Sequence, residues 1–175
     1  TRKPTQSIAA YELWARSRTI LAGQTQPSLQ EVVDGYNLII HALELDPAYA
    51  DAHNHLGIVH VARQQLGDAL NAFRTAVSLK PDDPLIHYNL GVVYVNLEQT
   101  TDAAEAFLES IRLKPDDPIV HYNLGLVYRN LGQHEDAIDP LHTAVSLNPD
   151  DPNIHYSPGE TYRYLERFEE AIGPL

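Results

Sequence analysis

The chain has 175 residues, enough for one domain of ordinary size with a sizeable core. Its 24 acidic residues outnumber 12 lysines and arginines, giving a formal net charge of −12; this disfavours nucleic acid and anionic membranes, which are bound through basic side chains. The absence of cysteine excludes disulfides, thiolate catalysis and cysteine-based metal sites, and the acidic charge favours a basic or neutral protein partner.

The first residues do not resemble a signal peptide, although a targeting segment could belong to a longer natural chain. Residues 1–7 are polar and lack the apolar centre of a signal peptide, and no apolar run approaches the roughly 20 residues of a transmembrane helix. The chain starts without Met and stops inside a helical pattern, so we expect it to be part of a longer protein. The compartment is left open, and a soluble cytoplasmic protein is the favoured expectation.

The first predicted elements form a divergent helix pair at residues 8–49, after the polar segment 1–7. A helix is expected at 11–21, followed by a long inner loop at 23–27. The Ser-Leu-Gln-Glu run at 28–31 matches a capping box, in which the first and last side chains satisfy free N–H groups at a helix start. We therefore expect the second helix to begin there and to run to about Asp46.

A repeat of 34 residues governs the rest of the chain. Residues 84–117 align with 118–151 without a gap, and 17 of the 34 positions are identical. The run His-Tyr-Asn-Leu-Gly recurs at 87–91 and 121–125, and related runs stand one period before and after. Such a period predicts two helices per unit, stacked into a solenoid. We expect one continuous domain with regular repeats at 50–83, 84–117 and 118–151 and a truncated repeat at 152–175.

Proline and aspartate mark the repeat junctions. Pro-Asp-Asp-Pro occurs at 81–84, 115–118 and 149–152. Its first proline ends the second helix of a repeat, since proline lacks an N–H group and clashes with the preceding turn. Its second aspartate is then an N-cap, and its second proline takes the favoured first-turn position. Asp83, Asp117 and Asp151 are therefore interpreted as structural.

Three further prolines fall inside predicted helices. Pro140 and Pro174 lie within second helices, where we expect a kink or a broken turn because proline removes a helical hydrogen bond. Pro158 replaces the leucine of the repeated motif and loosens its helix unless the helix begins there.

The packing positions of each repeat resemble a known family. The first helix carries Leu-Gly and then Tyr, at 90–94 and again at 124–128. The second helix carries a small, a bulky and a small residue before the closing proline: Ala69, Phe73, Ala76 and Pro81; Ala103, Phe107, Ser110 and Pro115; Ala137, Leu141, Ala144 and Pro149. From about residue 50 to 175 this pattern resembles the tetratricopeptide repeat family. The resemblance implies an all-α, right-handed superhelical solenoid of antiparallel helix pairs that binds proteins or peptides.

Side-chain size explains part of this pattern. Gly91 is expected to leave the gap into which a neighbouring helix fits, with Ala103 as its small counterpart on the partner helix. The opposite stripe of each first helix should then line the concave surface of the solenoid. This stripe is apolar near Ile58 and Val92 and becomes charged near Arg129 and Arg163.

Two ladders on that stripe suggest a peptide-binding groove. Tyrosines at 88, 122 and 156 are rigid amphipathic side chains of the kind enriched at binding hot spots. Asn89 and Asn123 can both donate to and accept from a peptide backbone, which is similar to the asparagine ladder of O-linked N-acetylglucosamine transferases. Alternatively, these side chains only support neighbouring helices. The predicted peptide-binding residues are Asn54, His55, Ile58, Tyr88, Asn89, Val92, Asn96, Tyr122, Asn123, Leu126, Arg129, Asn130 and Tyr156.

Other kinds of site are not expected. The family's carboxylate clamp needs basic residues, but Asp51, Tyr88 and Ile119 stand at the relevant points. One histidine recurs in each repeat, at 53, 87, 121 and 155. Equivalent helices lie about 10 Å apart, so they cannot bring two of these side chains to the roughly 2.0–2.1 Å at which zinc binds nitrogen. The histidines are therefore expected to replace a packed aromatic residue. No phosphate loop, nucleophile motif or His-Glu-x-x-His run occurs. We expect no enzyme activity, metal or cofactor.

Two alternative functions remain open at this point. An uncapped solenoid end could stack on a second copy of the chain, giving a homo-oligomeric scaffold by end-to-end contact. The chain could also be the interaction module of a larger signalling or enzyme protein.

Overall fold

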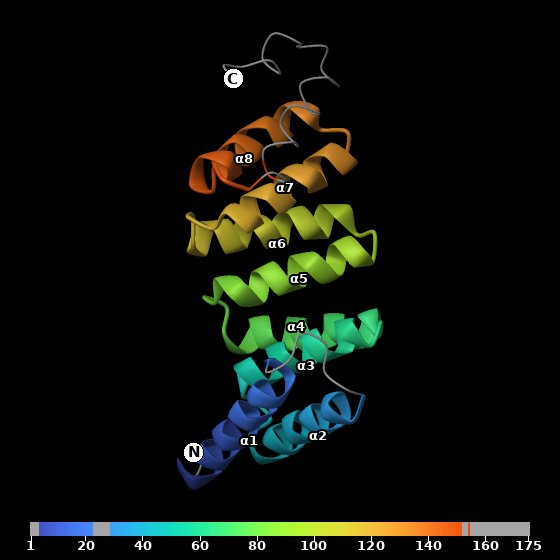
Figure 1. The fold of residues 1–175 in the computed structure, drawn as a ribbon, viewed down its shortest axis with the longest axis vertical. Helices are drawn as coiled ribbons and strands as arrows, with labels where there is room; N and C mark the ends of the chain where they lie inside the picture. Colours follow the sequence, from blue (N-terminus) through green and yellow to red (C-terminus); the bar gives the residue numbers. More distant parts are fainter. Residues whose placement is uncertain (1–3, 23–28, 152–153, 155–175) are drawn as a thin grey trace. The chain divides into compact units, whose positions relative to one another are not determined.

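The computed structural model describes residues 4–22, 29–151 and 154. Those residues fold into eight α-helices and no strand (Figure 1). In chain order the helices are α1 (Pro4–Ala22), α2 (Leu29–Leu45), α3 (Ala50–Ala62), α4 (Leu66–Leu79), α5 (Pro84–Asn96), α6 (Thr100–Leu113), α7 (Pro118–Asn130) and α8 (His134–Leu147).

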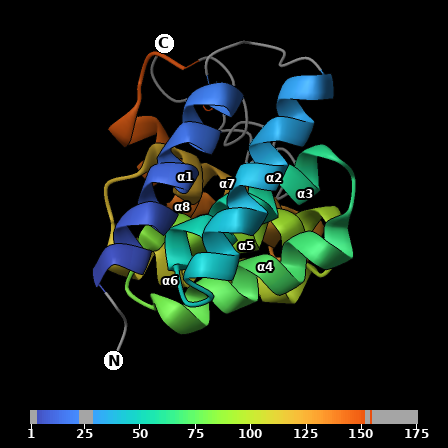
Figure 2. The same cartoon turned by 90° about the horizontal axis from the view of Figure 1, so that it is seen from below.

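The helices divide between two compact units, each of which is described by itself. The N-terminal unit, Thr1–Asp82, contains α1 to α4, and the C-terminal unit, Asp83–Leu175, contains α5 to α8. In the N-terminal unit α1 packs against α2 (Figure 2), α2 against α3, and α3 against α4. In the C-terminal unit α6 packs against both α5 and α7, and α7 packs against α8. Within each unit, helices that follow one another in the sequence therefore form the packed pairs.

At two of the three junctions the aspartate acts as the sequence predicts, and the start of the helix that Asp151 would cap lies outside the described residues. The Asp83 carboxylate accepts a hydrogen bond from the backbone N–H of Leu85 at 3.0 Å, and the Asp117 carboxylate accepts one from Ile119 at 3.2 Å. Each aspartate is the N-cap of its helix, and proline follows in the first turn. These bonds satisfy N–H groups that a helix start leaves free, so α5 and α7 begin at fixed residues.

Several other predicted elements start or continue differently. Helix α1 begins at Pro4 rather than near residue 11, because proline is well suited to a first helical turn. Helix α2 ends at Leu45, beside the predicted end at Asp46, whereas the inner loop and residue 28 of the capping box lie outside the described residues. Helix α8 stays helical through Pro140, so the expected broken turn does not occur. Pro158, Pro174 and the truncated repeat lie outside the described residues.

In the three regular repeats, the first helix contacts the second through a large side chain that packs against a glycine. A Cβ atom added to Gly91 would lie 2.6 Å from a ring carbon of Phe107, and one added to Gly57 would lie 2.6 Å from the ring of Phe73. In the following repeat Leu141 takes the same place against Gly125. This agrees with the expectation that a neighbouring helix fits into the gap at Gly91, and it shows that the fitted group is the Phe107 ring of α6.

In the three regular repeats, the turn after the first helix contains a residue in the left-handed conformation. Gln64, Glu98 and Gly132, one period apart, have φ values of 59°, 60° and 74°. After α5, the N–H of Gln99 donates to the Tyr94 carbonyl at 2.9 Å and that of Glu98 to the Val95 carbonyl at 3.0 Å. These two bonds form a Schellman motif, whose left-handed position favours glycine. Only the turn after α7 has glycine there.

Replacing Glu98 with glycine is expected to raise the free energy of unfolding by about 1 kcal/mol. A left-handed conformation costs an L-residue roughly 1–2 kcal/mol, and the greater freedom of unfolded glycine offsets part of that gain. Urea denaturation of wild type and Glu98→Gly measures the change. Gly132→Glu should change stability in the opposite direction, and a less stable Glu98→Gly protein would contradict the assignment.

Candidate functional site

Helix α5 places the predicted binding residues of its stripe at the protein surface. Tyr88, Asn89 and Val92 are half-buried and Asn96 is exposed. The Asn96 side chain donates to the Val92 carbonyl at 2.9 Å, so that amide hydrogen is used within its own helix. Tyr88 packs against the buried ring of Phe107, with 6.0 Å between ring centroids. This tyrosine therefore supports helix packing while part of its ring remains accessible.

Helix α7 repeats the arrangement one period later. Tyr122, Asn123, Leu126 and Arg129 are half-buried, and Asn130 is exposed. Because α5 and α7 both pack against α6, the two stripes belong to the same compact unit.

The remaining predicted binding residues lie elsewhere. On α3, in the N-terminal unit, Asn54 and His55 are half-buried, and Ile58 is exposed. Tyr156 lies outside the described residues. A role for these four residues in binding stays a prediction.

A cavity of about 350 Å³ lies where α5, the end of α6 and the start of α7 meet. Leu85 and Ile119 line it, and these side chains are 56% and 54% exposed although both are large and apolar. The other lining residues are Pro84, Tyr88, Ser110, Lys114, Asp117 and Val120. The cavity thus joins an apolar wall to one ion pair and one aromatic ring.

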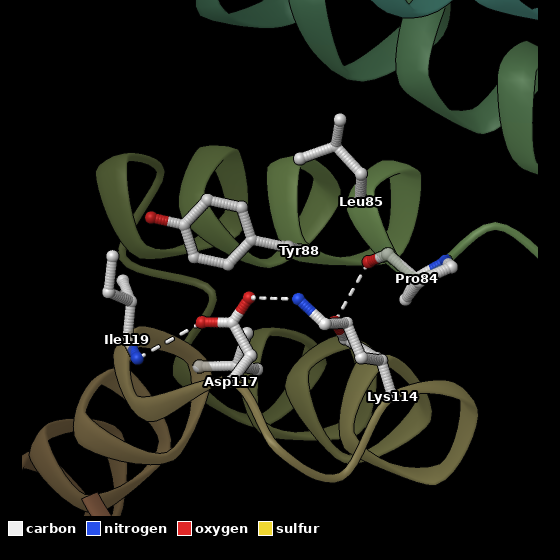
Figure 3. Close-up of a pocket in the computed structure, with 8 residues that line it drawn as sticks. Pro84, Leu85, Tyr88, Lys114, Asp117 and Ile119 are labelled. Carbon is white, nitrogen blue, oxygen red and sulfur yellow. Dashed lines mark hydrogen bonds and ion pairs between the residues drawn. The ribbon is translucent and has the colours of Figure 1, made fainter. Parts of the chain in front are cut away.

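Figure 3 shows how the polar residues of the cavity are held. Asp117 lies between Ile119, whose backbone N–H it accepts, and Lys114, whose Nζ is 3.3 Å from its other carboxylate oxygen. The buried Ser110 hydroxyl donates to the Pro84 carbonyl at 2.8 Å and so ties α6 to the first residue of α5. These contacts fix the polar side of the cavity, and Leu85, Tyr88 and Ile119 supply apolar lining.

The sequence interpretation missed Leu85 and Ile119 as candidate binding residues. Leu85 lies three and four residues before Tyr88 and Asn89, so it extends their stripe by one helical turn, and Ile119 stands one period later. The sequence interpretation treats Ile119 only as a position where a carboxylate clamp would need a basic residue. The signal available in the sequence is that large apolar residues, Leu85 and Ile119, stand at the same position of two successive repeats.

The recurring histidines have a structural role at the junctions. Nε2 of His53 lies 2.9 Å from the Pro47 carbonyl, and Nε2 of His121 lies 2.9 Å from the Pro115 carbonyl. A carbonyl only accepts, so Nε2 carries the proton in both cases. His87, at the same repeat position, is buried. The prediction that these histidines replace a packed aromatic residue did not include their hydrogen bonds. His155 lies outside the described residues.

Shifted pKa values occur at Tyr49, His55 and Glu109, none of which lines the cavity. Burial, and then the Arg18 guanidinium, lowers the pKa of His55, which favours its neutral form. Burial, followed by the Asp51 carboxylate, raises the pKa of Tyr49 to about 12. A hydrogen bond from Arg112 lowers the pKa of Glu109.

Among the described residues, no group of three or more histidine, aspartate or glutamate side chains could hold a metal ion. Nor is any helix there sufficiently long and apolar to span a bilayer.

Solved structures of the proteins MamA and YrrB have the same fold as this chain. "Crystal structure of MamA" aligns with a TM-score of 0.77 and 23% identity over 82% of this chain and 84% of that one. YrrB, described as a TPR protein with an unusual peptide-binding site, aligns with a TM-score of 0.79 and 24% identity over 93% of this chain and 81% of that one. MamA from Desulfovibrio magneticus RS-1 aligns with a TM-score of 0.81 and 19% identity over 93% of this chain and 89% of that one.

These structural likenesses show the fold, an all-α helical repeat solenoid. No curated protein sequence matches the chain. One family model, described as "TPR repeat", matches residues 59–98. A second, described as "Tetratricopeptide repeat", matches residues 88–152 and 122–175 and so covers half of the chain. The chain belongs to the tetratricopeptide repeat family.

Proposed function

We propose that the chain is a non-enzymatic protein-interaction scaffold that binds an extended peptide segment along α5 and α7. The observation that carries the proposal is the cavity beside these helices, whose wall includes two large apolar side chains that are more than half exposed. Exposed apolar surface is unfavourable in water, and its concentration at a cavity is typical of a binding site.

The chemistry of the two stripes supports a peptide as the bound group. Asn89 and Asn123 are half-buried and stand at the same repeat position, and their amides can donate to and accept from a peptide backbone. Tyr88 and Tyr122 add rigid aromatic surface of the kind enriched at hot spots. A peptide-binding site is described for YrrB, a protein of the same fold.

Selection of random dodecapeptides displayed on phage tests the proposal. The immobilised chain is expected to enrich binding peptides, whose affinities are then measured by isothermal titration calorimetry. Tyr122→Ala and Asn123→Ala are each expected to weaken the tightest peptide about tenfold or more, because each removes a contact from the middle of the stripe.

Leu108→Ala is the matched surface control. Leu108 is 46% exposed on α6 and is not a lining residue of the cavity, so this variant should bind as wild type does. Failure to enrich any peptide, or equal affinities for all four proteins, would contradict binding through α5 and α7.

A further inference from the structure

The cavity formed by α5, α6 and α7 differs from the asparagine stripe in the kind of group it accepts. Leu85, Ile119 and Val120 offer aliphatic surface, and Tyr88 adds its ring. A volume of about 350 Å³ falls at the lower end of the roughly 300–1,000 Å³ typical of ligand pockets. The space fits one or two side chains of an extended segment rather than a packed helix or domain.

The charge around the cavity restricts its occupant. From residue 83 to 151, twelve side chains are acidic and three are basic, a net charge of −9. Arg112 and Lys114 each pair with an acidic side chain of the same unit. Arg112 makes two bonds to Glu109, at 2.8 and 2.6 Å, and Lys114 pairs with Asp117 at 3.3 Å. The unit therefore attracts cationic partners and repels acidic ones.

Carboxylates of the repeat junctions line the cavity or adjoin its lining residues in the sequence. Asp117 lines it, Asp83 precedes the lining residue Pro84, and the exposed Asp116 precedes Asp117. Apolar walls and acidic junctions thus occur together at the starting ends of α5 and α7. A second copy of this chain has the same negative charge and is the less favoured occupant.

We propose that this cavity anchors one aliphatic side chain of a basic peptide segment, with lysine or arginine residues flanking the anchor. The inference rests on the proposed peptide-binding function and names the chemistry of its partner. The aliphatic anchor contacts Leu85, Tyr88 and Ile119, and its cationic neighbours face the junction carboxylates. The asparagine stripe holds the adjoining backbone.

The composition of the selected peptides gives the first test. Dodecapeptides enriched on the wild-type chain are expected to carry an excess of lysine and arginine and at least one leucine, isoleucine or methionine. Raising NaCl from 50 to 500 mM should weaken their binding, because salt screens exposed charges. Enrichment of acidic peptides, or of basic peptides without an aliphatic residue, would overturn the inference.

A mutant cycle between protein and peptide gives the second test, with the tightest selected dodecapeptide as the probe. The double variant Leu85→Ser/Ile119→Ser should bind this peptide about tenfold more weakly, since an apolar contact is lost. For a second peptide, in which serine replaces the aliphatic residue, the double variant and the wild-type protein should have equal affinities. Both positions are more than half exposed, and circular dichroism verifies that the variant is folded.

Leu108→Ser/Leu131→Ser is the control, because these side chains are 46% and 38% exposed and do not line the cavity. If Tyr122→Ala weakens the probe but the cavity variant does not, the anchor is wrong and the proposed function stands. If no peptide is enriched, the proposed function fails as well. Light scattering that shows a dimer for wild type and a monomer for the cavity variant would overturn the inference. The occupant of the cavity would then be a second copy of the chain and not a peptide.

Discussion

Phe107→Ala is expected to lower the free energy of unfolding of the C-terminal unit by about 3–5 kcal/mol. The Phe107 side chain is 0% exposed, its ring fills the space beside Gly91, and it also contacts the ring of Tyr88. Truncation removes the transfer free energy of the ring and leaves a cavity that the helices only partly close. Because single domains are stable by only about 5–15 kcal/mol, this is a large part of the total.

Urea denaturation followed by far-ultraviolet circular dichroism measures this loss. Leu108→Ala, the neighbouring truncation on the same helix, removes a side chain that is 46% exposed and should change stability by roughly 0.5 kcal/mol or less. A loss below about 1 kcal/mol for Phe107→Ala would show that the ring does not join α5 to α6 as the structure indicates.

Two glycine-to-alanine changes in the N-terminal unit are expected to have opposite signs. Gly57→Ala should lower stability by about 1–3 kcal/mol, since the new Cβ would lie 2.6 to 2.8 Å from three carbons of the buried Phe73 ring and either ring or helix must shift. Gly67→Ala should raise stability by about 0.5–1 kcal/mol. Gly67 is exposed in α4, nothing lies within 4 Å of its added Cβ, and alanine is the better helix former.

Thermal and urea unfolding of the two variants, compared with wild type, measure both signs. The pair is matched because the same methyl group is added within helices of one unit. Stabilisation by Gly57→Ala would mean that helix propensity outweighs the contact with Phe73, which would contradict close packing at that glycine.

The helical repeat could be predicted from the sequence because its boundaries are set by local chemistry. Proline stops a helix and aspartate caps the next one within four residues, and the capping bonds of Asp83 and Asp117 follow directly. Leu-Gly pairs and the bulky residue of the second helix likewise identify the packed face. The sequence did not indicate that Phe107 itself fills the space at Gly91, because that depends on which way the ring points between two helices.

Other features depend on tertiary packing that a periodic pattern does not describe. Helix α8 continues through Pro140, where burial of Ala137, Leu141 and Ala144 at 0% exposure favours the helix over the loss of one hydrogen bond. The hydrogen bond from His121 to the Pro115 carbonyl depends on the direction that the backbone takes after α6 ends. The cavity was missed for the same reason, since Leu85 and Ile119 belong to different helices and meet only when both pack on α6.

Nuclear magnetic resonance mapping of the bound peptide tests the central claim most directly. The chain is labelled at leucine, isoleucine and valine methyl groups and titrated with the tightest selected dodecapeptide. Binding along α5 and α7 predicts that the largest shift changes occur at Leu85, Val92, Ile119 and Leu126. Changes centred instead on Leu79, Leu108 and Leu147, which are exposed on second helices, would contradict it.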